Sequence, residues 1–280
     1  MLTIAGTLII GVSAFFLGRY LLFGNLPDDE AIRSYRPANT KNVDFDTHSL
    51  AFPEKPVRIW VHINRISPDL QKAVLISEDD TFYQHEGINW VEFKIALKKN
   101  IESKRYKRGA STITMQLARN AFLTKEKTLL RKFREVIVAR RMEEILSKRR
   151  IFELYLNIVE WGPNIYGAEA AARFYFNKSA SDLNMAEASM LAAMLPNPRR
   201  FNPVTRMKSA KKLQLRVLAL LRDARVITPE EYQMLTEQPL LLRNTRPEIP
   251  EDADEKIDSS ISQASNDSLL LIPDSTLDAM

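Results

Sequence analysis

Three segments of the sequence gather residue types that can do chemistry without a cysteine. The first is a run of acids, Glu78, Asp79 and Asp80, followed closely by His85 and Glu86. A carboxylate held on a loop between rigid elements can act as a general base. The alternative interpretation is a solvated acidic turn, which the composition alone favours.

The second segment, residues 108–120, places a glycine and hydroxyl side chains ahead of a helical pattern. Gly109 is followed by Ser111 and Thr112, whose N–H and hydroxyl groups can face an anion. The plainer interpretation is an ordinary helix start, since Ser and Thr are common there.

The third segment, residues 127–135, combines cations with one acid. Arg131 and Glu135 lie one helical turn apart, so an ion pair on a solvated helix is the simple interpretation. Ala139 and Met142 give Glu135 apolar neighbours, however, and a buried carboxylate is costly unless it is paired. Apolar residues surround most of the helical wheel over 128–147, which predicts a largely buried central helix.

With two later motifs, these segments resemble the peptidoglycan glycosyltransferases of family 51. The resemblance covers about residues 57–225, with five motifs in order. They are EDxxFxxHxG from Glu78, GxSTITxQLxxN from Gly109, RKxxE from Arg131, KRRIFELYLN from Lys148 and PNPxxFNP from Pro196. Conservative departures from the family pattern are Ala110, Met115, Arg119 and Phe201.

The resemblance implies a mainly α, lysozyme-like, two-lobed domain that polymerises lipid II, a disaccharide-pentapeptide on a polyprenyl diphosphate. The 4-hydroxyl of the acceptor attacks the anomeric carbon of the donor, which inverts to a β-1,4 link. A sugar hydroxyl is a poor nucleophile, so a general base is useful, and the family match assigns this role to Glu78. The diphosphate leaving group needs cations where negative charge develops.

The resemblance also distributes the remaining roles. Glu135, the second family glutamate, organises the cations or is the best candidate ligand for a divalent metal. Tyr155 and Asn157 fit a structural or a functional role equally. The expected substrate-binding residues are Asp79, Phe82, His85, Gly87, Ser111, Thr112, Gln116, Arg119, Asn120, Lys127, Arg131 and Lys148.

Cofactor and partner expectations follow from the same resemblance. A divalent cation, Mg²⁺ or Mn²⁺, is a candidate cofactor, and no organic cofactor is expected. The expected partners are lipid II, the growing glycan chain, the membrane and other proteins of cell-wall synthesis or division. No nucleic acid is expected, because the basic block is interleaved with the helix expected to be buried.

Composition limits the other classes of chemistry. The chain has 280 residues, of which 45% are hydrophobic, so wholesale disorder is excluded. It has no cysteine and 3 histidines, which excludes disulfide scaffolds and thiolate-bound zinc. The net charge of +5 hides a block at 94–150 with 18 Lys and Arg against 5 Asp and Glu, and an acidic stretch at 247–280. By charge alone, the partner of this basic block could be nucleic acid, an anionic membrane surface or a phosphorylated substrate.

The N-terminal 24 residues carry one charge, Arg19, and are long enough to span a bilayer. We expect an uncleaved single-pass anchor in the bacterial inner (plasma) membrane, with the catalytic domain on the periplasmic or extracellular side. A cleaved signal peptide is the alternative, although no basic n-region precedes the apolar run.

The rest of the chain must position the chemical residues. Residues 25–56 are expected to be a polar tether, 57–246 the catalytic domain and 247–280 a disordered acidic tail. A short strand is predicted at 57–63 and a helix at 68–77, capped by Ser67. Further helices should begin after Asn184, which forms a capping box with Glu187, and after Thr228.

Two other functions fit parts of the pattern. A lysozyme-like lytic enzyme also uses carboxylates, but its substrate has no diphosphate to occupy the basic block. A non-catalytic scaffold for cell-wall assembly would not need both glutamates. Ser209 and Lys212 spell SxxK without a following KTG, so a transpeptidase is not expected.

Overall fold

A computed structural model describes residues 13, 18, 23–24, 26–40, 43, 45, 49–103, 111–124, 126 and 128–243. The predicted acidic tail, most of the predicted anchor and Lys127 lie outside these residues. Within the described part of the chain, no helix is long and apolar enough to cross a membrane.

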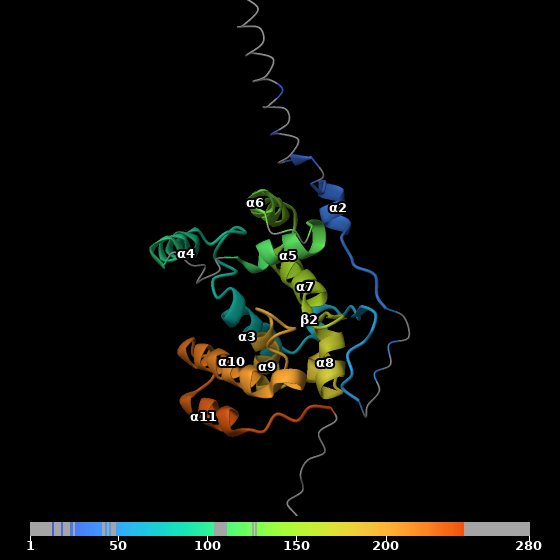
Figure 1. Cartoon of the computed structure of the whole chain (residues 1–280), viewed down its shortest axis with the longest axis vertical. Coiled ribbons are helices and arrows are strands. Elements are labelled where there is room, and N and C mark those ends of the chain that lie inside the picture. Colours follow the sequence, from blue (N-terminus) through green and yellow to red (C-terminus); the bar gives the residue numbers. More distant parts are fainter. Residues whose placement is uncertain are drawn as a thin grey trace, which may run out of the picture. The chain divides into compact units, whose positions relative to one another are not determined.

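Helices dominate the described residues, as predicted, and a small sheet joins them (Figure 1). The sheet has the order β1-β3-β2, with β1 parallel to β3 and β2 antiparallel to it. In chain order the elements are α2 (Asp29–Ser34), β1 (Val57–Arg58), η1 (Ile63–Arg65), α3 (Pro68–Glu78), α4 (Trp90–Ser103), α5 (Ile113–Phe122), α6 (Leu129–Ile145), α7 (Lys148–Ile158), β2 (Glu160–Gly162), β3 (Ile165–Tyr166), α8 (Ala168–Phe176), η2 (Ala180–Asp182), α9 (Met185–Met194), α10 (Pro203–Asp223) and α11 (Pro229–Glu237).

The predicted helix starts are confirmed. Ser67 accepts a hydrogen bond from the N–H of Asp69 at the start of α3, which ends one residue later than expected. Asn184 and Thr228 each form the reciprocal capping box before α9 and α11. These caps satisfy N–H groups that a helix leaves unpaired, so local sequence fixes where each helix begins.

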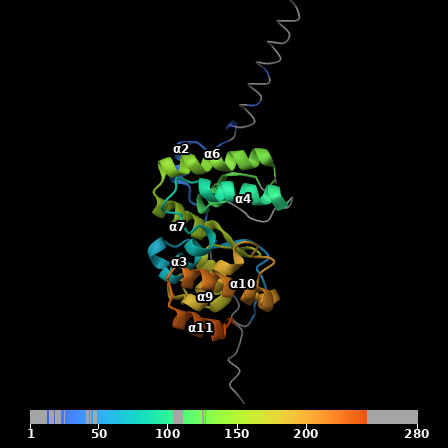
Figure 2. The ribbon, with the colours of Figure 1, turned by 90° about the vertical axis from the view of Figure 1, so that its left-hand side faces the viewer.

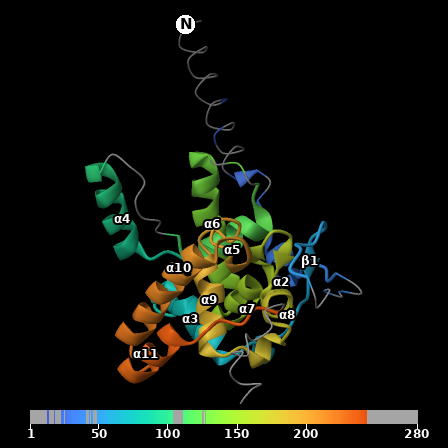
Figure 3. The same cartoon turned by 60° about the horizontal axis from the view of Figure 1, so that its bottom comes forward.

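Most of the helices form two packed groups. One group contains α3, α9, α10 and α11, and the other contains α5 and α6 with α7 packed on α5 (Figure 2). Every residue of α7 from Ile151 to Ile158 is buried, as is nearly all of α8 and α9. Figure 3 shows α4 standing out from both groups.

The burial predicted for the third segment is wrong. The helix forms as α6, but Leu129 is 82% exposed and Phe133 is 62% exposed. Its buried residues are Glu135, Val138, Ala139 and Met142, which form one stripe facing α5. Val136 and Ile145 are partly buried against the core, whereas Leu129 and Phe133 face away from it, so α6 lies at the edge of its group.

The described part of the predicted tether is not extended chain throughout. Asp28 caps α2, and Ile32 of α2 is fully buried where α2 packs on α6. The predicted strand at 57–63 is shorter than expected, because only β1 pairs with β3. The N–H of Val61 instead binds the side-chain oxygen of Asn157.

Candidate active site

Glu78 ends α3 and points its carboxylate at α5. The side-chain amide of Gln116 donates a hydrogen bond of 2.8 Å to Glu78 Oε2. The hydroxyl of Tyr155 on α7 donates to the other end of that amide, 3.2 Å from Gln116 Oε1. Three elements therefore fix one partly buried carboxylate through a single amide.

The electrostatics of Glu78 suit a base. Burial raises the pKa of its carboxyl above the ordinary value, and the neighbouring Asp79 raises it further. The hydrogen bond from Gln116 and the charge of Arg119 act in the opposite direction. A carboxylate with a raised pKa accepts a proton more readily than an exposed one does.

Asp79 and His85 hold the loop that follows Glu78. His85 Nε2 lies 2.9 and 3.1 Å from the two carboxylate oxygens of Asp79. Asp79 Oδ2 also accepts the N–H of Ile113, 3.0 Å away, at the first residue of α5. An acid at a helix N-terminus is stabilised by the unpaired N–H groups there. Asp79 thus ties Glu78 to α5.

Phe82 and Gly87, two other residues predicted to bind substrate, are buried in the same loop, and Thr112 is buried at the start of α5. Phe82 is 1% exposed and packs on Phe152 of α7. Gly87 has φ +81°, and a Cβ there would lie 3.2 Å from the carbonyl oxygen of Ala139. Thr112 caps α5 and donates 2.6 Å to the carbonyl of Gly87. In this structure these residues position the loop.

Lys148 is also engaged inside the protein. Its ammonium lies 2.8 Å from the carboxylate of Glu143 and 4.4 Å from the ring centroid of Phe82. Thr114 donates a 2.5 Å hydrogen bond to the same Glu143 oxygen. This carboxylate joins α5, α6 and the start of α7.

The second carboxylate, Glu135, is fully buried between two cations. Arg131 forms an ion pair with one oxygen, one turn earlier on α6, and Lys132 Nζ lies 2.7 Å from the other. Arg131 also donates to the carbonyl of Glu126. The predicted pairing of Glu135 is therefore confirmed, and burial excludes the simple solvated pair.

Lys132 connects this cluster to the second motif. Its ammonium donates to the hydroxyl of Ser111, 2.7 Å away. Burial, followed by the charges of Arg119 and Arg131, lowers the pKa of Lys132 to about 8. The Glu135 carboxylate favours its charged form.

Helix α5 brings the two glutamates into one site. Ser111, just before α5, binds the Glu135 cluster, while Gln116, five residues later in the sequence, binds Glu78. The charge of Arg119 lowers the pKa of Glu78 and that of Lys132, so it is close enough to act on both groups. Asn120 follows it and is exposed.

The residues around Glu135 do not fit a divalent cation. Among the described residues, no three carboxylate or imidazole groups gather as metal ligands. Both Glu135 oxygens already face cations, which would repel a metal ion. The expected divalent cation stays a prediction, and no step below depends on it.

Sequence reasoning missed two members of the site, Lys132 and Glu143. Lys132 is the second letter of RKxxE, so the motif itself contained the information. Glu143 has no motif, and only the fold brings it to Thr114 and Lys148.

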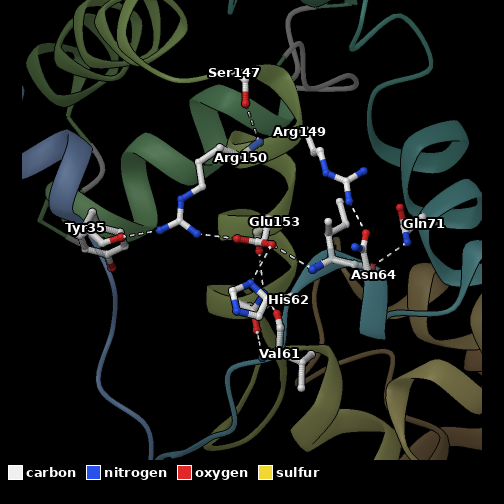
Figure 4. Close-up of polar contacts among 11 residues, drawn as sticks. Tyr35, Val61, His62, Asn64, Gln71, Ser147, Arg149, Arg150 and Glu153 are labelled. Carbon is white, nitrogen blue, oxygen red and sulfur yellow. Dashed lines mark hydrogen bonds and ion pairs between the residues drawn. The ribbon is translucent and has the colours of Figure 1, made fainter.

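The KRRIFELYLN motif fixes α7 against residues 61–63, and we call the contacts of Glu153 and Asn157 with these residues the brace. Glu153 accepts from Arg150 and from the N–H of Ile63, 2.9 Å away (Figure 4). Asn157 binds the N–H and the carbonyl of Val61, each at 2.9 Å. These bonds fix α7 against residues 61–63, so Asn157 has a structural role, while Tyr155 reaches Gln116.

The arrangement supports a reaction in which a carboxylate removes a proton from a substrate while nearby cations stabilise negative charge that develops on it. Glu78 can accept a proton, and the Arg119, Arg131 and Lys132 cations can face negative charge across α5.

A family model and curated relatives identify the same family. A sequence model described as Transglycosylase matches residues 46–222. Relatives named biosynthetic peptidoglycan transglycosylase occur in Laribacter hongkongensis (43% identical over 188 residues, 65% of this chain and 82% of the relative) and Aromatoleum aromaticum (45% over 170 residues, 60% and 74%). The crystal structure of penicillin-binding protein 1A from Haemophilus influenzae aligns with a TM-score of 0.42 and 21% identity, over 75% of this chain and 21% of that one.

Proposed function

Since this chain belongs to the transglycosylase family, we propose that it is a monofunctional peptidoglycan glycosyltransferase that polymerises lipid II into β-1,4 glycan strands for cell-wall synthesis. The observation that carries the proposal is the pairing of a carboxylate of raised pKa with a cation cluster on adjoining elements. We also propose that the two packed groups of helices are the two lobes of a lysozyme-like fold.

In the proposed reaction, Glu78 removes the proton from the 4-hydroxyl of the incoming lipid II. The resulting oxygen attacks the anomeric carbon of the lipid-linked chain, and the bond to the diphosphate breaks with inversion. Arg119, Arg131 and Lys132 stabilise the charge that develops on the diphosphate, together with Lys127 outside the described residues. Gln116 orients the base.

Glu135 serves as the counterion of this cluster. Two cations held close together repel each other, and the buried carboxylate between them offsets that cost. Lys148, Phe82, Asp79, His85, Gly87 and Thr112 act by holding the loop and helices that carry the reacting groups.

The membrane is part of the proposal, because a polyprenyl substrate stays in the bilayer. We propose that residues 1–24 anchor the chain, with the catalytic domain (57–246) on the periplasmic side. Trp90, Val91 and Ile95 are exposed on α4, which suits contact with a lipid interface. Val91→Asp with Ile95→Asp should slow lipid II use in vesicles but not in detergent; equal rates in both would contradict this contact.

The test is incubation of the detergent-solubilised full chain with labelled lipid II. We expect long glycan strands, and we expect Glu78→Gln to abolish them while the variant keeps its melting temperature. Cleavage of preformed glycan would instead indicate a lytic enzyme. Absence of both activities from a folded protein would indicate a scaffold.

A further inference from the structure

Helix α6 is held from a side that the catalytic cluster does not occupy. Arg141 Nε lies 2.7 Å from the carboxylate of Asp29, and its NH1 donates 2.9 Å to the carbonyl of Pro27. Arg134 donates 3.1 Å to the carbonyl of Gly24. We name Gly24 and residues 26–36 the strap. Figure 2 shows α2, the helical part of the strap, beside α6.

The two arginines show that the strap runs along α6. Arg134 and Arg141 are seven residues apart, which is two helical turns and roughly 10 Å on one side of the helix. Gly24 meets the first arginine, and Pro27 and Asp29 meet the second. At about 100° per residue, Glu135 lies a quarter turn around from Arg134. The strap therefore contacts one side of α6, and the cluster around Glu135 lies on the adjacent side.

The strap is fastened independently to the elements that carry the rest of the site. Ile32 is fully buried, and the ring of Tyr35 lies 4.8 Å from that of Phe122 at the end of α5. The carbonyl of Tyr35 accepts from Arg150 of α7, 3.3 Å away (Figure 4). The strap thus links α6 to α5 and α7 by contacts outside the α5–α6 packing.

We propose that the strap is a positioning element of the active site, with Arg141 and Asp29 as its positioning pair. The inference rests on the proposed function. Only one stripe of α6 is buried, so the strap restricts how α6 can slide or turn on α5. Such movement would displace Arg131 and Lys132 from the diphosphate, and errors of about 1 Å in catalytic geometry cost up to roughly 100-fold in rate.

The test compares two ion pairs of similar exposure. Arg141 and Asp29 are 39% and 57% exposed, and Arg222 and Asp223 of α10 are 38% and 64% exposed. Because both pairs are largely exposed to solvent, removing either one should have a similarly small effect on stability. We expect Arg141→Gln to lower kcat about tenfold with KM within about twofold, and Arg222→Gln to leave both unchanged. The double variant that exchanges the two charges, Asp29→Arg with Arg141→Asp, should recover most of the kcat that Arg141→Gln loses.

Hydrogen exchange separates this inference from the proposed function. In Arg141→Gln, amides of α6 should exchange at least about fivefold faster than in the wild type, whereas Arg222→Gln should leave them unchanged. Equal kcat in Arg141→Gln and Arg222→Gln would overturn the inference, as would unchanged α6 exchange. If the wild-type chain does not polymerise lipid II, the proposed function fails and the exchange result alone decides on the strap.

Discussion

Glu78 on α3 and Glu135 on α6 are both connected to α5, but they meet opposite surroundings. Glu78 receives one neutral hydrogen bond, from Gln116, and its burial raises the pKa of its carboxyl. Glu135 is fully buried and touches two cations, Arg131 and Lys132. A carboxylate with no cation in direct contact can take up a proton, whereas one between two cations stays ionised. Their surroundings therefore give the two glutamates different roles, Glu78 as a base and Glu135 as a counterion.

The largest expected effect is on catalysis at Glu78. Glu78→Gln should lower kcat by about 1,000-fold, because the amide cannot accept the proton. Its free energy of unfolding should stay within about 1 kcal/mol of the wild type, since a neutral amide avoids the cost of a buried charge. Polymerisation rates and urea denaturation measure the two effects, and a large loss of stability would contradict the comparison.

Unlike Glu78→Gln, the Glu135→Gln variant should lose stability. Removing the counterion leaves Arg131 and Lys132 without their carboxylate, which should lower the free energy of unfolding by about 3 kcal/mol. Urea denaturation next to Glu78→Gln gives the comparison directly. If Glu135→Gln unfolds no more easily than Glu78→Gln, the counterion role is wrong.

Lys132 should set the alkaline side of the pH profile. Its pKa is lowered to about 8, so its positive charge and the anion stabilisation it supplies are lost as the pH rises through that value. Lys132→Arg keeps the charge at every accessible pH and should not show this decline. Steady-state rates of the wild type and of Lys132→Arg test this difference from about pH 6 to about pH 10, roughly the range between the reference pKa values of His and Lys. The same decline in both proteins would assign it to another group.

The smallest expected effect is a shift of the acidic side of the profile. Glu78 must be ionised to act, so activity falls as the pH drops through its pKa, which lies above the ordinary 4.5. The hydrogen bond from Gln116 lowers that pKa. Gln116→Leu should therefore raise it and move the loss of activity to higher pH. A shift toward lower pH in kcat/KM would show that another group controls this limb.

The sequence predicts the parts of this molecule that depend on near neighbours. Ser67, Asn184 and Thr228 each cap a helix through residues two or three positions ahead, and all three predictions are confirmed. The identification of Glu135 as a paired acid also needed only residues on its own helix.

Features set by distant segments could not be predicted in the same way. The exposure of Phe133 depends on which elements cover α6, and helical periodicity does not contain that information. Glu143 enters the site only because α5 and α7 meet α6, and Asp29 binds a residue 112 positions away. A polar stretch with one buried isoleucine, Ile32, has too little pattern to predict the strap.

The brace at Glu153 and Asn157 has a consequence for the order in which the chain is made. Val61 and Asn157 are 96 residues apart, yet the backbone of Val61 is satisfied by that side chain. At bacterial synthesis rates of about 5 to 20 residues per second, residues 61–63 wait roughly 5 to 20 s for their partners. During that interval residues 79–87, the loop that follows Glu78, cannot reach their final position. We expect the ribosome-bound chain to become resistant to protease at residues 61–87 only after residue 157 has emerged.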